Sequence, residues 1–451
     1  MSGSTGPGSG IDFKREGPEL TRALVVHVER KTRKAPMAWD RDAASKLQEA
    51  MGLADAIDLE IELALIAPLV APRPATFLGS GKVEEIAGKV QEAEAELVVV
   101  NAQLSPIQQR NLETAWKCKV LDRTGLILEI FGRRAVTREG SLQVELAHLQ
   151  YQRSRLVRSW THLERQRGGF GFLGGPGESQ LEADRRLIQE RIAKIEGELE
   201  TVVKTRDLHR KGRERVPYPI VALVGYTNAG KSTLFNKLTN ANVLAKDLLF
   251  ATLDPTMRNI TLPSGRKIIM SDTVGFISEL PTTLIAAFRA TLEEVLAADV
   301  ILHVRDIAHG ESEAQAHDVT HVLTELGLSE ERRGQIIEVW NKADLLDAPH
   351  RAGMLAKAER RADVALVSSL SGEGVEHLMD LVELRLARSS TIYEITFGAA
   401  DGGGLAWAHQ RGEVIDRKSH DDGRTTLTLR LDDDAAGQAR AKYGKAIKVK
   451  K

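Results

Sequence analysis

Apolar and polar positions along residues 21–135 follow two alternating rhythms, and each rhythm predicts a different element. Short, nearly continuous apolar runs predict buried strands, while apolar residues three or four positions apart predict amphipathic helices. The predicted strands are Ala23–Val28, Leu59–Ile66, Glu96–Asn101 and Lys119–Asp122; the predicted helices are Ala43–Met51, one that Gly79 opens and Val90 ends, and one that starts at Ser105. Strands that alternate with helices predict a small parallel α/β sheet. Residues 1–20 are rich in glycine and serine, so we expect a disordered tail there.

From Val136 onward the apolar residues recur in steps of four and three, which predicts long helices with a coiled-coil seam. The first series is Leu142, Leu146, Leu149, Leu156, Trp160 and Leu163, and the second is Ile188, Ile192, Ile195, Leu199 and Val202. A glycine-rich break separates the two series. They therefore predict an antiparallel helical hairpin over residues 136–215.

The glycine-rich break contains more glycine than the closure of a hairpin needs. Phe170 and Phe172 lie among these glycines, Arg167 precedes them, and further arginines, Arg155 included, occupy the neighbouring turns. Rings that stack and guanidinium groups that pair with phosphate would suit RNA. Two plainer interpretations stay open: arginines on a solvated helix face, and phenyl rings that pack back onto the hairpin.

The alternation of buried strands and helices returns over residues 216–389, and short strands dominate residues 390–451. The predicted strands are Val221–Val224, Lys267–Ser271, Ile336–Trp340 and Val364–Val367 in the first region, and Ile392–Phe397, Glu413–Asp416 and Thr425–Leu431 in the second. A helix at Asp432–Lys442 and a basic tail at Lys445–Lys451 complete a small α+β domain. The predicted fold class is α/β, with an N-terminal parallel domain, a helical-hairpin linker, a P-loop domain and this C-terminal domain.

Composition places the chain among ordinary globular proteins, with 42% apolar and 28% charged residues. The formal net charge of −1 excludes a global attraction to nucleic acid, so any basic surface has to be local. The single cysteine, Cys118, cannot form an internal disulfide, and we expect a buried, inert thiol within a strand. The sequence shows no apolar run of membrane-spanning length and no signal-peptide pattern. We therefore expect a soluble cytoplasmic protein.

Candidate chemistry begins directly after the strand Val221–Val224. The Gly-x4-Gly-Lys-Ser pattern of a phosphate-binding loop starts at Gly225, and a helix follows it. Its N–H groups would converge on phosphate, while Lys231 would add a charge over the β- and γ-phosphates and Ser232 would bind Mg²⁺. The predicted nucleotide contacts are Gly225, Tyr226, Thr227, Asn228, Ala229, Gly230, Lys231, Ser232 and Thr233.

Two stretches downstream supply the other parts of a phosphate sensor. Thr252 lies in a polar loop and is the candidate hydroxyl that binds magnesium and senses the γ-phosphate, with Thr256 in reserve. Asp272 follows a predicted strand and can hold magnesium through water, while the N–H of Gly275 can meet the γ-phosphate. The candidate catalytic residues are Lys231, Thr252 and Gly275, and the candidate metal site is Ser232, Thr252 and Asp272.

Two further stretches predict that the base is guanine. Asp344 can accept hydrogen bonds from guanine N1–H and the 2-amino group together, a pair that adenine does not offer. Asn341 would brace this loop, Lys342 would cover the base, and a backbone N–H of the Ser368-Ser369-Leu370 turn can reach guanine O6. All of these residues follow strands, where open α/β sheets bind ligands. The sequence therefore predicts that the chain binds GTP.

Three features leave alternatives open. The stretch Gly79-Ser-Gly81-Lys82 is too short for a P-loop, and it is either a phosphate contact or a plain helix N-terminus. Asn228 either coordinates potassium beside the phosphates or braces the loop through a hydrogen bond. Phe276 stands where many GTPases carry a glutamine that orients the attacking water. A phenyl ring cannot do this, so slow intrinsic hydrolysis is predicted.

Several strings resemble the HflX family, translation-factor-class GTPases that bind ribosomes. They are Leu104–Leu112, Asp122–Leu128, Leu142–Leu149, Gly175–Glu182, Phe250–Thr256 and Asp272–Phe276, and the resemblance covers about residues 21–388. Ser369 replaces a commoner alanine, which matters little because the backbone makes the contact. The resemblance implies a helical linker that reaches the peptidyl-transferase region and GTP-dependent dissociation of stalled ribosomes. It also implies ATP binding and weak ATPase activity in the N-terminal domain, for which this chain has no strong motif.

The leading interpretation is an enzyme: a monomeric, magnesium-dependent GTPase that binds the large ribosomal subunit and its RNA, is activated there, and splits or rescues stalled ribosomes. The alternative is a binding module, a GTP-gated RNA-binding or large-subunit assembly scaffold whose hydrolysis only resets it. A partnership with a tRNA-modifying enzyme is less favoured, because the sequence contains no cysteine pair or other recognisable modification chemistry.

Overall fold

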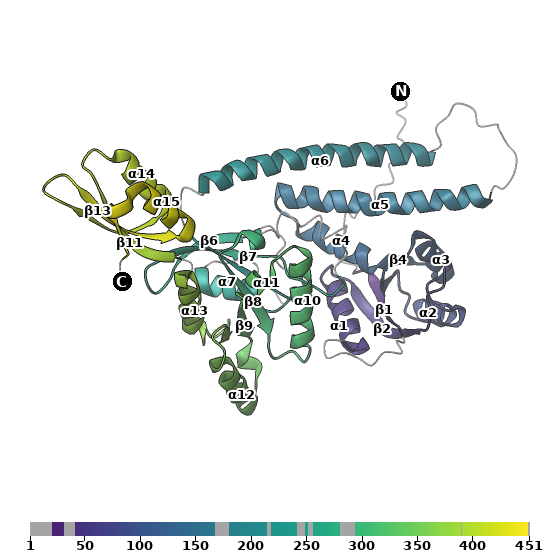
Figure 1. Cartoon of the computed structure of the whole chain (residues 1–451). Coiled ribbons are helices and arrows are strands. Elements are labelled where there is room, and N and C mark those ends of the chain that lie inside the picture. The colour runs from purple at the N-terminus through teal and green to yellow at the C-terminus, as the bar shows by residue number, and fades with distance from the viewer. Residues whose placement is uncertain are drawn as a thin grey trace, which may run out of the picture.

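A computed structural model describes residues 20–30, 41–166, 180–213, 218–240, 249–250, 256–279, 294–388 and 390–449 (Figure 1). Three sheets follow one another across the molecule, and two long helices run above them in this view. Within these residues, none of the helices is both long and apolar enough to span a membrane. The predicted fold class, with its parallel N-terminal sheet, P-loop domain, helical region and C-terminal domain, is confirmed.

The N-terminal sheet is parallel and has the strand order β2-β1-β3-β4. Its strands are β1 (Arg22–Arg30), β2 (Glu60–Leu69), β3 (Leu97–Asn101) and β4 (Lys119–Asp122). Helices α2 (Ser80–Glu92) and α3 (Pro106–Trp116) cover one face, and α1 (Ala43–Asp55) and α4 (Arg123–Arg134) cover the other. Ser105 and Gln108 form a reciprocal capping box that starts α3 where the sequence predicts it.

Helix α4 has no counterpart among the predicted elements. It begins at Arg123 because the side chain of Asp122, the last residue of β4, accepts a hydrogen bond from Gly125 N at 2.8 Å. Every residue from Arg123 to Leu128 is buried, the polar ones included, so the first turns of the helix have no exposed face. A helix of this kind cannot be distinguished from a buried strand by periodicity alone.

The predicted antiparallel hairpin consists of α5 (Arg138–Gln166) and α6 (Gln180–Arg213), which lie side by side (Figure 1). Ile192 and Ile195 are buried in their seam, and Arg191 and Glu145 join the helices through two parallel contacts of 2.7 and 2.8 Å. The predicted glycine-rich tip, with Arg167, Phe170 and Phe172, lies outside the described residues.

Arg155 does not belong to an RNA-facing set of arginines. Its guanidinium donates to the buried carboxylate of Asp122 at 2.8 Å and lies 4.0 Å from the ring centre of Tyr151. The Tyr151 hydroxyl also donates to Asp122, at 2.6 Å. Together these contacts fix α5 to the end of β4, so the helical arm is anchored on the N-terminal domain.

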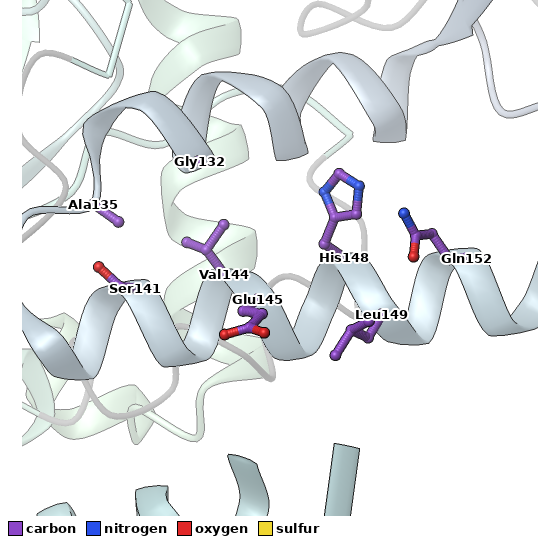
Figure 2. A pocket seen from close by; sticks show the side chains of 8 residues that line it. All are labelled: Gly132, Ala135, Ser141, Val144, Glu145, His148, Leu149 and Gln152. Atoms are coloured by element: carbon purple, nitrogen blue, oxygen red, sulfur yellow. The ribbon is translucent and has the colours of Figure 1, made fainter. Parts of the chain in front are cut away.

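A cavity of about 350 Å³ lies between α4 and α5 (Figure 2). Its lining mixes small, apolar and polar residues and shares none with the P-loop: Gly132, Ala135, Ser141, Val144, Glu145, His148, Leu149 and Gln152. Because Glu145 is paired with Arg191, the carboxylate that lines this cavity is already neutralised. We therefore assign the cavity no part in the chemistry below.

The central sheet has the order β10-β9-β8-β5-β7-β6, and β6 alone runs antiparallel to its neighbour. Its strands are β5 (Ile220–Gly225), β6 (Thr256–Thr261), β7 (Lys267–Asp272), β8 (Val300–Asp306), β9 (Ile337–Asn341) and β10 (Val364–Leu366). Around it lie α7 (Lys231–Thr239), α10 (Ser312–Glu325), α11 (Glu330–Arg333), α12 (Ala348–Glu359) and α13 (Val375–Arg388). This is the doubly wound arrangement that the sequence predicts, and the strand order reverses at β5.

The C-terminal sheet is antiparallel, with the order β12-β13-β11-β14. It contains β11 (Ser390–Phe397), α14 (Gly402–Arg411), β12 (Glu413–Ser419), β13 (Thr425–Asp432), α15 (Asp433–Tyr443) and β14 (Ile447–Val449). Within the predicted basic tail from Lys445, the residues of β14 form a strand that pairs with β11. Helix α14 was missed because three glycines form its first turn, where Asp401 caps Gly404 N at 2.8 Å.

Cys118 lies one residue before β4 and is half-buried, so its predicted place within a buried strand was wrong. Partial burial, followed by the nearby carboxylate of Glu113, raises the pKa of its thiol to about 11. The thiol is therefore protonated at neutral pH, which agrees with the predicted lack of reactivity.

One apolar core joins the N-terminal and central sheets. Residues of α1 and α4 pack with residues of β5, α10 and the segment after β7 in a single cluster of buried side chains. Within it, the rings of Phe131 and Phe250 meet edge to face at 4.7 Å. The N-terminal domain thus packs against Phe250, which precedes the candidate Thr252, and against Val274 and Phe276, which flank Gly275.

Candidate nucleotide site

The phosphate loop occupies the turn between β5 and α7. Gly225 has φ 152° and Gly230 has φ 91°, and a Cβ on Gly230 would collide with the side-chain amide of Asn341. Residues with side chains rarely adopt this backbone, so both positions require glycine. The first turn of α7 follows at once, which directs its N–H groups into the loop.

Lys231 lies fully inside the loop. Its Nζ donates to Tyr226 O at 2.7 Å and to Gly225 O at 3.1 Å. Burial lowers the pKa of this ammonium to about 8, against an opposing effect of Asp272. A buried cation with no full counter-charge favours an incoming polyphosphate, which would restore its ordinary protonation.

Ser232 and Asp272 meet at the position where a magnesium ion would bind. The Ser232 hydroxyl donates to Asp272 Oδ2 at 2.7 Å, and Asp272 is fully buried at the end of β7. A hydroxyl and a carboxylate are the hard oxygen donors that Mg²⁺ prefers, and such ions are completed by phosphate and water. The residues present therefore fit the predicted ion.

The segment after β7 lies directly against the loop. Phe276 N donates to Gly225 O at 3.1 Å, and Thr227 N donates to Phe276 O at 2.7 Å. A Cβ on Gly275 would lie 2.7 Å from Thr227 Cγ2 and 3.1 Å from Lys231 Nζ, so only glycine fits between the segment and the lysine. The ring of Phe276 is buried in the core that joins the two domains, away from any role in orienting water.

The predicted base-reading residues gather at the carboxyl ends of β9 and β10. Asn341 Nδ2 donates to Ala229 O at 2.8 Å, and its Oδ1 accepts from Ser369 N at 3.0 Å and Ser369 Oγ at 2.7 Å. Asn341 therefore ties the P-loop to the turn after β10. Lys342 has φ 66° and pairs with Asp306 Oδ2 at 2.8 Å, while Asp344 is exposed in the next turn.

The structure thus brings most of the predicted nucleotide residues to one edge of the sheet. Ser368 is buried, whereas Leu370 is largely exposed, and a backbone contact from this turn needs neither side chain. Asn228 is exposed with φ 60°. Thr252 lies outside the described residues, and Thr256 begins β6 and pairs with Asp272 across the hairpin. The roles of these residues stay predictions.

The sequence analysis did not predict the residues whose hydrogen bonds and ion pairs hold this site in place. Thr273 Oγ1 donates to Leu223 O at 2.6 Å and fixes the end of β7 on β5. Asp306 orients Lys342, and its place at the end of β8 could have suggested this. The Tyr226 hydroxyl contacts residues of the N-terminal domain, for which the sequence contains no local signal.

Comparisons with known families match the chain in four consecutive parts. The matching descriptions are GTP-binding GTPase N-terminal over residues 44–132, GTP-binding GTPase Middle Region over 134–213, 50S ribosome-binding GTPase over 220–342, and HflX C-terminal domain over 353–451. The order and extent of these matches account for most of the chain.

Full-length relatives are similar over nearly the same span. The chain is 52% identical to GTPase HflX of Magnetococcus marinus, over 87% of this chain and 89% of the relative. It is 42% identical to GTPase HflX of Escherichia coli, over 91% of this chain and 93% of the relative. A solved GTP-binding protein from Sulfolobus solfataricus in complex with GDP is 24% identical, with a TM-score of 0.43, over 82% of this chain and 99% of that chain.

Proposed function

The chain belongs to the HflX family of GTPases, and from this premise we propose that it hydrolyses GTP on the large ribosomal subunit and splits or rescues stalled ribosomes. One observation carries the GTPase part of this proposal. Lys231, the Ser232–Asp272 pair and the Asn341–Ser369 brace converge on one glycine-lined turn. Phosphate, magnesium and base contacts thereby become available within a single site.

Each group has a separate task in hydrolysis. The N–H groups of the loop and Lys231 hold the β- and γ-phosphates, and Asp344 selects guanine over adenine. Ser232, Asp272 and Thr252 would hold Mg²⁺, which when bound would supply positive charge beside the phosphates. Gly275 N–H would contact the γ-phosphate after a small movement of its segment. Because Phe276 has no group that can orient water, we expect slow hydrolysis by the free protein and acceleration on the ribosome.

The helical arm supports a ribosomal partner. Its helices contain 29 and 34 residues, and at about 1.5 Å per residue α5 alone extends roughly 45 Å. The Asp122 contacts and the Arg191–Glu145 pair stiffen it, so little ordering entropy is lost when its end is inserted into a partner. We propose that its tip, with Arg167, Phe170 and Phe172, contacts the RNA of the large subunit.

Sedimentation of stalled ribosomes tests this function. We expect the protein with GTP to convert intact particles into subunits, and the variant with both Phe170→Ala and Phe172→Ala to lose this effect while GTP affinity and thermal stability stay close to those of the parent. If the double variant splits ribosomes normally, the tip is not the effector. If it unfolds, the rings belong to a core.

The same experiment separates the alternative, a GTP-gated scaffold for RNA or large-subunit assembly. A scaffold would bind the large subunit with GTP but would leave the intact particles unchanged. The observation that favours the scaffold is the extensive packing of the N-terminal domain on the P-loop domain, which suits a conformational gate. Splitting of intact particles would exclude the scaffold as the whole function.

Two ion and nucleotide predictions remain part of this proposal. Asn228 is the candidate ligand for potassium beside the phosphates, with a loop-bracing hydrogen bond as its alternative role. Equal hydrolysis rates in potassium and sodium at matched ionic strength would contradict the potassium role. ATP binding by the N-terminal domain has less support, because the carboxyl edge of its sheet is filled by its own side chains, among them His27, Asn101 and Arg123. We further propose that the protein acts as a monomer in the cytoplasm.

A further inference from the structure

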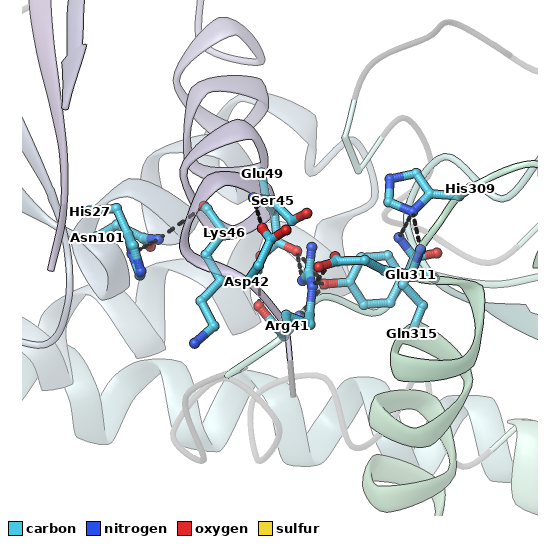
Figure 3. A network of polar contacts seen from close by, with 12 residues as sticks. His27, Arg41, Asp42, Ser45, Lys46, Glu49, Asn101, His309, Glu311 and Gln315 are labelled. Carbon is cyan, nitrogen blue, oxygen red and sulfur yellow. Dashed lines mark hydrogen bonds and ion pairs between the residues drawn. The ribbon is translucent and has the colours of Figure 1, made fainter. Parts of the chain in front are cut away.

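A buried polar cluster joins the carboxyl edge of the N-terminal sheet to the phosphate loop. Figure 3 shows Arg41, Glu49 and Glu311 of this cluster. Its centre is Glu49 of α1, which pairs with Arg41 and, at 2.6 Å, with Arg123 of α4. These three side chains are 5%, 7% and 6% exposed. Arg41 also pairs with Glu311, just before α10, at 2.5 Å. Charges at this depth need complete partners, so the cluster is a built feature of the domain contact.

The phosphate loop enters this cluster through Tyr226, the residue after Gly225. Its hydroxyl donates to Glu49 Oε2 and accepts from Arg41 Nη1 at 2.8 Å. The same oxygen accepts from the backbone N of Ser278 at 2.7 Å. One hydroxyl therefore connects the P-loop, the N-terminal domain and the segment after β7.

That segment is held at Ser278 by the N-terminal domain as well. The Ser278 hydroxyl donates to Glu49 Oε1 at 2.7 Å, and Arg123 Nη2 donates to Ser278 O at 2.6 Å. Three residues before Ser278 lies Gly275, whose N–H is the predicted sensor of the γ-phosphate. An anchor this close restricts how far the sensor can move.

The anchored position brings Gly275 against the lysine that would hold the γ-phosphate. A phosphate oxygen between Lys231 and the Gly275 N–H needs about 2.8 Å to each nitrogen. In the structure a Cβ on Gly275 would already lie 3.1 Å from Lys231 Nζ. A γ-phosphate would have to enter between Gly275 and Lys231, whereas GDP, which has no γ-phosphate, needs no space there.

We propose that Glu49, Arg123 and Tyr226 are positioning residues that hold the segment 272–278 in its GDP-compatible place, so that the N-terminal domain sets the preference for GDP over GTP. This inference rests on the GTPase function proposed above. A ribosomal contact that moves the N-terminal domain would release Ser278 and let Gly275 meet the γ-phosphate. The same cluster would thus couple the arm, anchored on Asp122, to the nucleotide.

Two independent features support this assignment. Burial opposes ionisation of Glu49, but Arg123 and Arg41 outweigh it and lower its pKa to about 2, so the carboxylate keeps its charge at neutral pH. The N-terminal domain also contacts the flank of the other predicted sensor, through Phe131 on Phe250 and through Gly52 near Leu249. It therefore touches both phosphate-sensing stretches and not the P-loop alone.

Two conservative variants of the full chain test the proposal. Tyr226→Phe removes the shared hydroxyl, and Ser278→Ala removes the serine contact without leaving a buried charge unpaired. The matched control is Ser154→Ala, because Ser154 donates only within its own helix, to Tyr151 O. The measurements are the affinities for GDP and for a non-hydrolysable GTP analogue, together with the hydrolysis rate.

We expect either variant to raise the ratio of GTP-analogue affinity to GDP affinity about fivefold or more, with no change in the control. In Ser278→Ala the GDP affinity itself should also stay unchanged. Unchanged ratios of GTP to GDP affinity, or a parallel loss of both affinities, would overturn the proposal. Hydrogen exchange without nucleotide gives a second reading: the peptide over 272–279 should exchange faster in the variants than in Ser154→Ala, and equal protection would also overturn it. A wild-type chain that binds GTP but leaves ribosomes intact contradicts the proposed function and leaves this test valid.

Discussion

The N-terminal sheet and the central sheet share a parallel architecture but differ in the residues at the carboxyl ends of their central strands. Strand β1 ends at a set of large polar side chains that pair with one another, including His27 with Asn101 at 3.0 Å. Strand β5 ends in a turn in which Gly225 and Gly230 have positive φ and contribute no side chains. Both edges are topological switch points, where such sheets bind ligands. We infer that a switch point can bind a ligand only where large side chains do not already fill the ends of the strands.

Substitution of one glycine near each sheet is expected to show the largest difference between the two. Gly230→Ala should reduce GTP affinity by about 4 kcal/mol or more, because it adds left-handed strain to a collision with Asn341. Gly81→Ala meets open space inside α2 and should leave GTP affinity unchanged while stabilising the fold by about 0.5–1 kcal/mol. Calorimetric titration and thermal unfolding measure both. A loss of nucleotide binding in Gly81→Ala would instead favour a phosphate contact at Gly79-Ser-Gly81-Lys82.

Two buried carboxylates at strand ends provide the next test. Asp122 accepts hydrogen bonds from two backbone N–H groups, a tyrosine and an arginine, so Asp122→Ala should cost about 3–4 kcal/mol of unfolding free energy. Asp272 contacts Ser232 at the predicted magnesium site, so Asp272→Asn should mainly reduce the magnesium dependence of GTP binding. Chemical denaturation and titration with and without Mg²⁺ separate the effects. Equal effects of both variants on both measurements would contradict the division into a structural edge and a catalytic edge.

How much of each sheet edge could be predicted from the sequence depends on how far apart its contacting residues lie along the chain. The P-loop, the strand-end aspartates and the base-reading loop are local strings, so spacing alone was enough to propose them. The Glu49–Tyr226 contact spans 177 positions and has no periodic or compositional signal. Helix α14 was hidden by Gly402, Gly403 and Gly404, and β14 by the lysines around its short apolar core. Local patterns were thus enough to predict candidate site residues, while the contacts that we propose to control them are tertiary.

Base selection is expected to have a smaller effect than the loop backbone. Asp344→Asn should reduce GTP affinity by about 2–3 kcal/mol, because a paired donor site on guanine would face a donor. Affinity for xanthosine triphosphate should rise. Competition binding with both nucleotides measures the exchange, and the matched control is Asp347→Asn, which alters a helix cap and the contact of Asp347 with the His350 ring. Unchanged GTP affinity would mean that Asp344 does not read the base.

The smallest expected effect is a pH dependence that distinguishes the buried lysine of the central sheet. Burial lowers the pKa of Lys231 to about 8 from its ordinary 10.5, so the unfolded chain binds more protons between these values. Stability of the protein without nucleotide should therefore rise as pH increases from 8 to 10.5. GTP affinity should change in the opposite direction, since phosphates bind the charged lysine, and it should fall about tenfold, or about 1.4 kcal/mol, from about pH 7 to about pH 9. In Lys231→Arg the side chain stays charged, so its weaker binding should be flat over this range. A wild-type affinity that is equally flat would show that Lys231 keeps its proton in the folded loop.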